Sequence, residues 1–117
     1  MNEEKILLAL KSLEDDLDQE SVSELVQDFL QEAPVNLEEI QSLISRGPSA
    51  ELTRAAHSLK GCCSIYRAEE LVQLCQQLET ASRSGHAEAF SPTMVSLVQG
   101  IEELLGILKR YSAQNAR

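Results

Sequence analysis

Hydrophobic residues recur along the chain at steps of three and four residues, the spacing of one face of an α-helix. This pattern predicts five helices, at about residues 3–14, 21–45, 49–66, 68–84 and 91–111. Short connections make sequential helices antiparallel neighbours. We therefore expect an all-α fold: an antiparallel up-down-up-down four-helix bundle with a short extra N-terminal helix, in one domain that spans residues 1–117.

The predicted helix at 21–45 has a proline near its middle, Pro34. Its start is indicated by the capping box SVSE at residues 21–24, in which a serine and a glutamate cap the first turn reciprocally. The hydrophobic stripe keeps its phase across Pro34, which favours one long, kinked helix over two abutting helices. The stripe consists of Val22, Val26, Phe29, Ala33, Leu37, Ile40 and Ile44.

Capping preferences predict the remaining helix boundaries. The residues that they select are Asn2, Gly47, Pro48 or Ser49, Gly85, Ser91 and Pro92. The stripes of the last three helices are Leu52, Ala56, Leu59, Cys63 and Tyr66; Leu71, Leu74, Cys75 and Leu78; and Met94, Val98, Ile101, Leu105, Leu108 and Tyr111. The polar tail from Ser112 to Arg117 is expected to fray.

The net charge of −9 argues against a partner that is itself an anionic polymer or surface, so we expect neither nucleic acid nor membrane as a partner. No apolar run approaches the roughly 18 residues of a membrane span, and the acidic N-terminus does not resemble a signal peptide. Three cysteines, two of them adjacent, form no disulfide framework and indicate a reducing cytoplasm. Met1 and the polar tail favour a free-standing protein.

His57 lies beside the hydrophobic stripe of the third helix but points away from it. The default interpretation of such a histidine is a solvated or core-edge residue without a function. Its neighbours favour a functional role. Gly61, one turn after His57, costs about 1 kcal/mol of helix stability relative to alanine, and its lack of a side chain leaves His57 more accessible. The residues that share the face are Thr53, Arg54, Lys60, Gly61 and Ser64. They form a small polar and basic patch in an acidic protein.

The fourth helix brings a carboxylate to the height of His57. If two antiparallel helices turn near Ala68, residues equidistant from the turn lie at the same height, and this pairs His57 with Glu79. Gln76 is the alternative if the turn is one residue shorter, and a solvated helix charge is the alternative role of Glu79. Arg83 adds a basic residue one turn beyond.

The sequence resembles the histidine-containing phosphotransfer (HPt) family of two-component phosphorelays. The resemblance rests on Ala56-His57-Ser58-Leu59-Lys60-Gly61, followed by Ala68, Leu71, Leu74-Cys75 and Leu78-Glu79. The segment from Phe29 to Ile40, with its internal proline, is similar to the long helix of the family. In detail the match covers about residues 20–85.

The resemblance implies that His57 takes a phosphoryl group from a receiver-domain aspartate and passes it to another. Lys60 would hold phosphoryl oxygens, and Glu79 would orient the imidazole. The partner-binding residues would be Thr53, Arg54, Gly61, Ser64 and Arg83. The expected partners are response-regulator receiver domains, with a hybrid sensor kinase as a further candidate. We expect a monomer without cofactor, metal or ATP-dependent kinase activity of its own, and Mg²⁺ on the receiver.

The chain departs from the family at two places. Arg67 stands where a glycine is usual, and a non-glycine residue at positive φ costs on the order of 1 kcal/mol. The departure at Arg67 puts the position of Glu79 opposite His57 in question more than the assignment of His57 itself. Cys62 and Cys63 replace the usual small residues; Cys63 lies on the core stripe, whereas Cys62 lies off it and is expected to be partly exposed.

Three other functions compete with this one. A metal site could draw on His57, Cys62, Cys63, Cys75 and His86, but the two adjacent cysteines diverge on a helix and no CxxC motif is present. A non-catalytic adaptor would bind receivers through the same bundle without carrying phosphate. An independent kinase or hydrolase lacks support, because no glycine-rich nucleotide loop is present.

Overall fold

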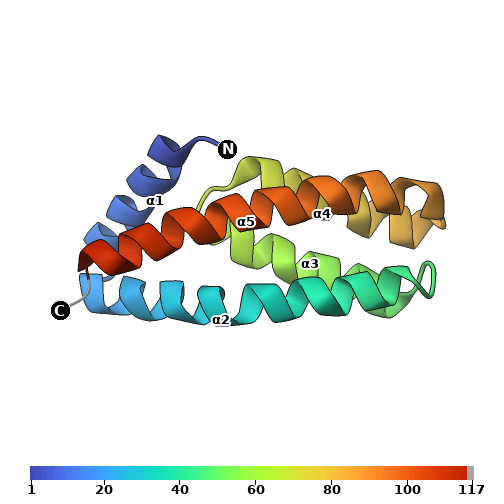
Figure 1. Cartoon of the computed structure of the whole chain (residues 1–117), viewed down its shortest axis with the longest axis horizontal. Coiled ribbons are helices and arrows are strands. Elements are labelled where there is room, and N and C mark those ends of the chain that lie inside the picture. The colour runs from blue at the N-terminus through green and yellow to red at the C-terminus, as the bar shows by residue number, and fades with distance from the viewer. Residues whose placement is uncertain (116–117) are drawn as a thin grey trace.

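The computed structural model describes residues 1–115, and within them the chain forms five α-helices and one turn of 3₁₀-helix (Figure 1). The elements are α1 (Glu3–Asp16), α2 (Gln19–Ile44), α3 (Ala50–Ile65), α4 (Glu69–Ser84), η1 (Ala87–Ala89) and α5 (Phe90–Asn115). Helices α2 to α5 lie along the long axis of a molecule that measures 46 × 22 × 21 Å, and successive helices run in opposite directions in Figure 1. The predicted all-α bundle is confirmed.

The extra helix α1 lies obliquely across one end of the bundle, beside the C-terminal half of α5 (Figure 1). Asn2 caps it as predicted, since its side chain accepts a hydrogen bond from the Lys5 amide. Ile6 and Leu10 are fully buried against the bundle. The Tyr111 hydroxyl donates to Glu14 at 2.8 Å, which ties α5 to α1.

The hydrophobic stripes form one core between the helices. The predicted stripe of α3 is entirely buried, and that of α2 is buried except for Ile44, where Leu43 faces inward instead. In α4, Leu74 is only partly buried. In α5 the predicted residues Met94, Ile101, Leu108 and Tyr111 are buried and Val98 and Leu105 are half-buried, while Leu97 and Leu104, which were not predicted, are fully buried. The reason is that α5 packs against α4, α2 and α1 together, so its buried face is broader than one stripe.

The predicted start of α2 is wrong. The capping box at residues 21–24 does not form, because α2 already begins at Gln19 with Asp18 as its N-cap. The Ser21 amide donates to the Asp18 carboxylate at 2.6 Å, and this hydrogen bond lowers the pKa of Asp18. An aspartate caps a helix as well as a serine does, and once Asp18 takes that role Ser21 lies inside the first turn. The helix then continues through Pro34 to Ile44.

The predicted cap and the predicted end of α5 are also wrong, although its start agrees within one residue. The helix begins at Phe90, so Pro92 is its third residue and Ser91 is not a cap. A proline is tolerated there because the first four amides of a helix have no partner within the helix. At the other end α5 continues to Asn115. Its last turn is tied to α2, because the Gln27 side chain donates to the Ser112 hydroxyl at 2.6 Å. Residues 116–117, which were also expected to fray, lie outside the described part of the chain.

Helices α3 and α4 form a tight hairpin that carries the residues discussed below. Ser49 caps α3 by accepting from the Leu52 amide at 3.0 Å. The turn places Arg67 at φ 53°, the left-handed conformation expected from its position, and the Ala68 amide donates to the Cys63 carbonyl at 3.3 Å. Gly47 and Gly85 have positive φ at the ends of α2 and α4, as predicted.

Candidate functional site

His57 lies on the exposed side of α3, next to α4. Its side chain is 68% exposed, whereas Ala56 and Leu59 on the core stripe are fully buried. The periodicity of α3 explains this placement, because successive residues of a helix diverge by about 100°. The prediction that His57 points away from the core is therefore confirmed.

Glu79 faces His57 from α4, as the height argument predicted. His57 Nδ1 lies 3.1 Å from Glu79 Oε1, while the Glu79 side chain is only 6% exposed. The two residues are equidistant from a turn that keeps its expected length, although Arg67 replaces the glycine. Glu79 is therefore a buried partner of His57, and the interpretation as a solvated helix charge is wrong.

Two cationic side chains join His57 around the Glu79 carboxylate. Lys60 Nζ donates to Oε1 at 3.0 Å, the oxygen that also faces His57, and Arg83 Nη2 donates to Oε2 at 2.8 Å. Burial raises the pKa of Glu79, but the hydrogen bonds from Lys60, Arg83 and His57 outweigh it, so the pKa falls below its ordinary value. Glu79 is consequently ionised at neutral pH.

An ionised Glu79 determines which nitrogen of His57 carries the proton. A carboxylate only accepts hydrogen bonds, so the facing Nδ1 must donate. In the neutral imidazole the lone pair then lies on Nε2. The exposed ring therefore has one nitrogen held by the protein and one that is a competent nucleophile.

Lys60 is held in a second interaction that the sequence did not predict. Its Nζ donates to Gln76 Oε1 at 2.7 Å, and the Gln76 amide donates to Thr80 Oγ1 at 3.0 Å. Gln76, the alternative partner for His57, thus binds Lys60 instead. The same height argument could have identified this pair, because Lys60 and Gln76 are also equidistant from the turn.

Gly61 leaves open space next to His57. A Cβ atom built on it would meet no heavy atom of the described chain within 4 Å, so packing inside this molecule does not require glycine there. Gly100 differs, since a Cβ atom would collide with the Leu71 side chain of α4. Gly100 thus allows α5 and α4 to pack closely, whereas Gly61 leaves the surface beside His57 free of a side chain.

The other residues proposed to bind a partner have different environments. Thr53 is half-buried, and its hydroxyl oxygen lies within hydrogen-bond distance of both the Ser49 carbonyl and the Ser82 hydroxyl, each at 3.0 Å. Ser64 is exposed and donates to the Gly61 carbonyl at 2.7 Å, and Arg54 is exposed. The site proper thus contains His57, Lys60, Glu79 and Arg83. Partner contacts by Thr53, Arg54, Gly61, Ser64 and Arg83 remain predictions.

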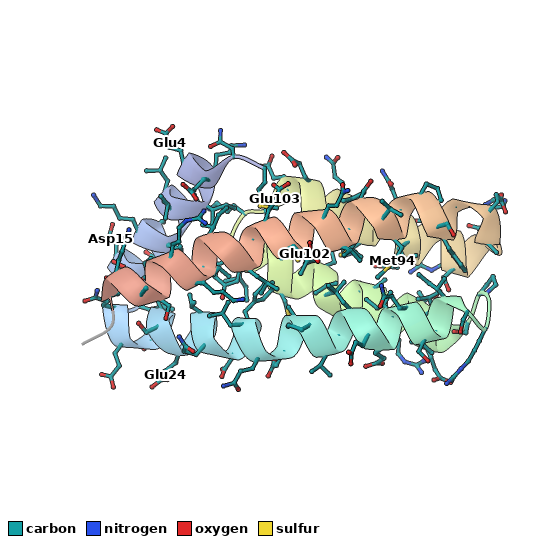
Figure 2. The ribbon with its side chains drawn as sticks, in the orientation of Figure 1. Glu4, Asp15, Glu24, Met94, Glu102 and Glu103 are labelled. Carbon is teal, nitrogen blue, oxygen red and sulfur yellow. The ribbon has the colours of Figure 1, made fainter. Side chains whose placement is uncertain are left out.

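Charge is distributed unevenly over the molecule. Residues 52–68 include three basic residues and no acidic one. Helix α2 has no basic residue, and its acidic residues are Glu20, Glu24, Asp28, Glu32, Glu38 and Glu39. In Figure 2 Glu24 points outward from α2, as Glu4 and Asp15 do from α1. Helix α3 from Leu52 onward is thus the basic part of an acidic protein, whereas the charged residues of α4 are Glu69, Glu70, Glu79 and Arg83.

The thiols are placed as the stripe indicated. Cys63 and Cys75 are buried, Cys62 is partly exposed, and burial raises the pKa of the Cys62 thiol. Among residues 1–115, no three histidine, cysteine, aspartate or glutamate side chains come together as a metal site would require. Within the same residues, no helix has the length and apolar character needed to cross a bilayer.

The comparison with known protein families gave one match. The Hpt domain model matches residues 24–110, which include most of α2 and α5 and the whole α3–α4 hairpin. No curated protein and no solved structure matched the chain. His57, the exposed histidine of this hairpin, lies within the matched region. The chain therefore belongs to the Hpt domain family, the histidine-containing phosphotransfer domains of two-component signalling.

Proposed function

We propose that this protein is a phosphorelay intermediate. His57 accepts a phosphoryl group from the aspartate of one response-regulator receiver domain and passes it to the aspartate of another. The observation that carries the proposal is the contact of Nδ1 with the buried Glu79 carboxylate, which leaves Nε2 of an exposed ring as the nucleophile. A neutral imidazole is reactive near pH 7, so no strong base is needed beside it.

The transfer step can be written with its atoms balanced. The Nε2 lone pair attacks phosphorus of the aspartyl phosphate, the N–P bond forms, and the bond from phosphorus to the aspartate oxygen breaks. The aspartate leaves as a carboxylate, and the ring becomes an imidazolium that keeps its Nδ1 proton. Glu79 stabilises that positive charge from 3.1 Å. The reverse step, with a second receiver's carboxylate as nucleophile, restores neutral His57.

Lys60 supplies positive charge for the transferred group. Phosphoryl transfer depends mainly on positioning and on neutralising the charge of the equatorial oxygens. The Lys60 ammonium, one turn after His57 and 20% exposed, is a mobile point charge that can turn from Glu79 to a phosphoryl oxygen. The chain has no cofactor of its own in this proposal, and the receiver provides Mg²⁺ together with the second carboxylate.

The basic stretch of α3 around His57 fits a receiver. A site that binds Mg²⁺ and carries an aspartate is rich in carboxylates, so it is attracted to a face without exposed acidic residues between 52 and 68. The low surface at Gly61 allows that site to approach His57. Arg54 and Ser64, both exposed, would lie at the edge of the contact.

The test is transfer of labelled phosphate from phosphorylated receivers of the source organism, with the wild type and His57→Gln compared. We expect label on the wild type alone, in a form that acid removes and alkali does not, as for a phosphoramidate. A second receiver should then discharge it. Label on His57→Gln would overturn the assignment of the phosphoacceptor. Binding of receivers without any label on the wild type would establish the adaptor function instead.

A further inference from the structure

The Glu79 carboxylate divides its partners between its two oxygens. Oε1 faces His57 and Lys60, whereas Oε2 is bound by Arg83 alone among these three, at 2.8 Å. The Glu79 side chain is 6% exposed, and a buried carboxylate is stable only while cations and hydrogen bonds surround it. The two cations in this cluster, Lys60 and Arg83, thus perform the same task in the unphosphorylated protein.

Phosphorylation would separate these two cations. If Lys60 turns to the phosphoryl oxygens, it leaves Oε1, and Glu79 keeps only the His57 ring and Arg83. If Arg83 were absent as well, the Glu79 carboxylate would be a buried charge without a cation, beside a dianionic phosphoryl group. It would then turn away or take up a proton. Either change would remove the acceptor that holds the proton on Nδ1.

Arg83 is placed to prevent this. It follows Glu79 by four residues on α4, a spacing that puts both side chains on one helix face, so the ion pair does not depend on α3. An exposed ion pair of this kind contributes little to stability, but here the Glu79 carboxylate is buried and the Arg83 guanidinium is permanently charged. Arg83 also uses the oxygen that neither His57 nor Lys60 contacts.

We propose that Arg83 is a positioning residue for the phosphotransfer reaction, which acts through Glu79. It holds the carboxylate against Nδ1 of His57 while Lys60 is engaged by the phosphoryl group. The inference rests on the function proposed above. It has a specific corollary: Arg83 matters because residue 79 is a glutamate, and it loses its role when residue 79 carries no charge.

The test is a double-mutant cycle with Arg83→Gln, Glu79→Gln and the double variant. Phosphoramidate is the phosphoryl donor, so no receiver is needed. We expect Arg83→Gln to slow phosphorylation of His57 by roughly tenfold, as loss of one charged hydrogen bond does. In the Glu79→Gln background the same change should alter the rate by less than about twofold. Arg83→Lys, which keeps the charge at the same helix spacing, should recover most of the rate.

A second measurement distinguishes positioning from mere stability. Nitrogen-15 NMR of the imidazole reports the tautomer of His57, and we expect Arg83→Gln to lower the population with the proton on Nδ1. Arg110→Gln is the matched control, since Arg110 is 63% exposed against 62% for Arg83 and pairs with the exposed Glu3 on the α1 side of the bundle. It should change neither the rate nor the tautomer.

The possible failures point to different conclusions. If phosphoramidate does not phosphorylate wild-type His57, the proposed function itself is wrong. If the wild type is phosphorylated but Arg83→Gln matches it in rate and tautomer, the inference about Arg83 is wrong. An equal loss in the wild-type and Glu79→Gln backgrounds would also overturn it, because Arg83 would then act independently of Glu79.

Discussion

His57 of α3 and Glu79 of α4 are 22 residues apart in the sequence and 3.1 Å apart at Nδ1 and Oε1. The His57 side chain is 68% exposed and the Glu79 side chain 6% exposed, so a buried carboxylate holds a solvent-facing ring. The ring is therefore oriented by the packing of two helices, and a receiver need not rearrange it.

Replacement of Lys60 by alanine should slow phosphotransfer from a receiver by about a hundredfold, the loss typical of one charge-stabilising donor. Helicity should be unchanged, because the side chain ends at the surface site with Glu79 and Gln76. Transfer kinetics and far-ultraviolet circular dichroism check the two statements. A large loss of helicity would show that Lys60 is needed for folding.

Two substitutions of Gly61 should have opposite consequences. Gly61→Ala should raise the free energy of unfolding by up to about 1 kcal/mol, since glycine is a poor helix former and the added methyl meets no atom of the described chain within 4 Å. Gly61→Leu should fold equally well and yet slow transfer from a receiver, because its side chain fills the approach to His57. Phosphorylation by phosphoramidate, a small donor, should be much less affected. Equal slowing with both donors would contradict the access role.

The ion pairs of Glu79 should make stability depend on pH. The pKa of Glu79 lies below its ordinary value of 4.5, so the carboxylate stabilises the fold above about pH 4.5, and this contribution is lost as the pH falls through the lower folded value. The difference in unfolding free energy between wild type and Glu79→Gln should therefore shrink from pH 7 to pH 3. Urea titrations at both values check this, with Glu102→Gln as the control. A difference that does not change with pH would contradict it.

Arg67→Gly should stabilise the protein. The left-handed conformation at φ 53° costs a non-glycine residue about 1–2 kcal/mol, and the greater freedom of glycine in the unfolded chain offsets about 0.4–1 kcal/mol of the gain. The net increase in unfolding free energy should be somewhat below about 1 kcal/mol. Denaturant unfolding measures it. A decrease would mean that the Arg67 side chain makes a compensating contact.

The sequence predicted this site well because its geometry follows from helical periodicity. The stripe of α3 has a fixed phase, so it placed His57 outside the core, and counting from the turn placed Glu79 opposite. Gly47 and Gly85 could be assigned positive φ because few other residues adopt it readily. Local rules sufficed wherever one conformation was clearly preferred.

Competition between signals explains what the sequence did not predict. Asp18 and Ser21 are both good caps by residue type, and the structure uses Asp18, which accepts from the Ser21 amide. Ser91-Pro92 looked like a helix start, yet Phe90 is 3% exposed and already belongs to the helix. The pairing of Lys60 with Gln76 was missed because Gln76 was considered only as a partner for His57, although counting from the turn places it opposite Lys60.

The connection at Arg67 and Ala68 also limits how this protein can change in evolution. An added residue that joined the first turn of α4 would rotate the rest of that helix by about 100° relative to α3 and shift it by about 1.5 Å. Glu79 and Gln76 would lose their partners on α3 together, while the core could be rebuilt with a new set of leucines. Insertions between Gly85 and Ala89, beyond the end of α4, leave that register intact. Length variants among related sequences should therefore accumulate in the later connection and be absent from the earlier one.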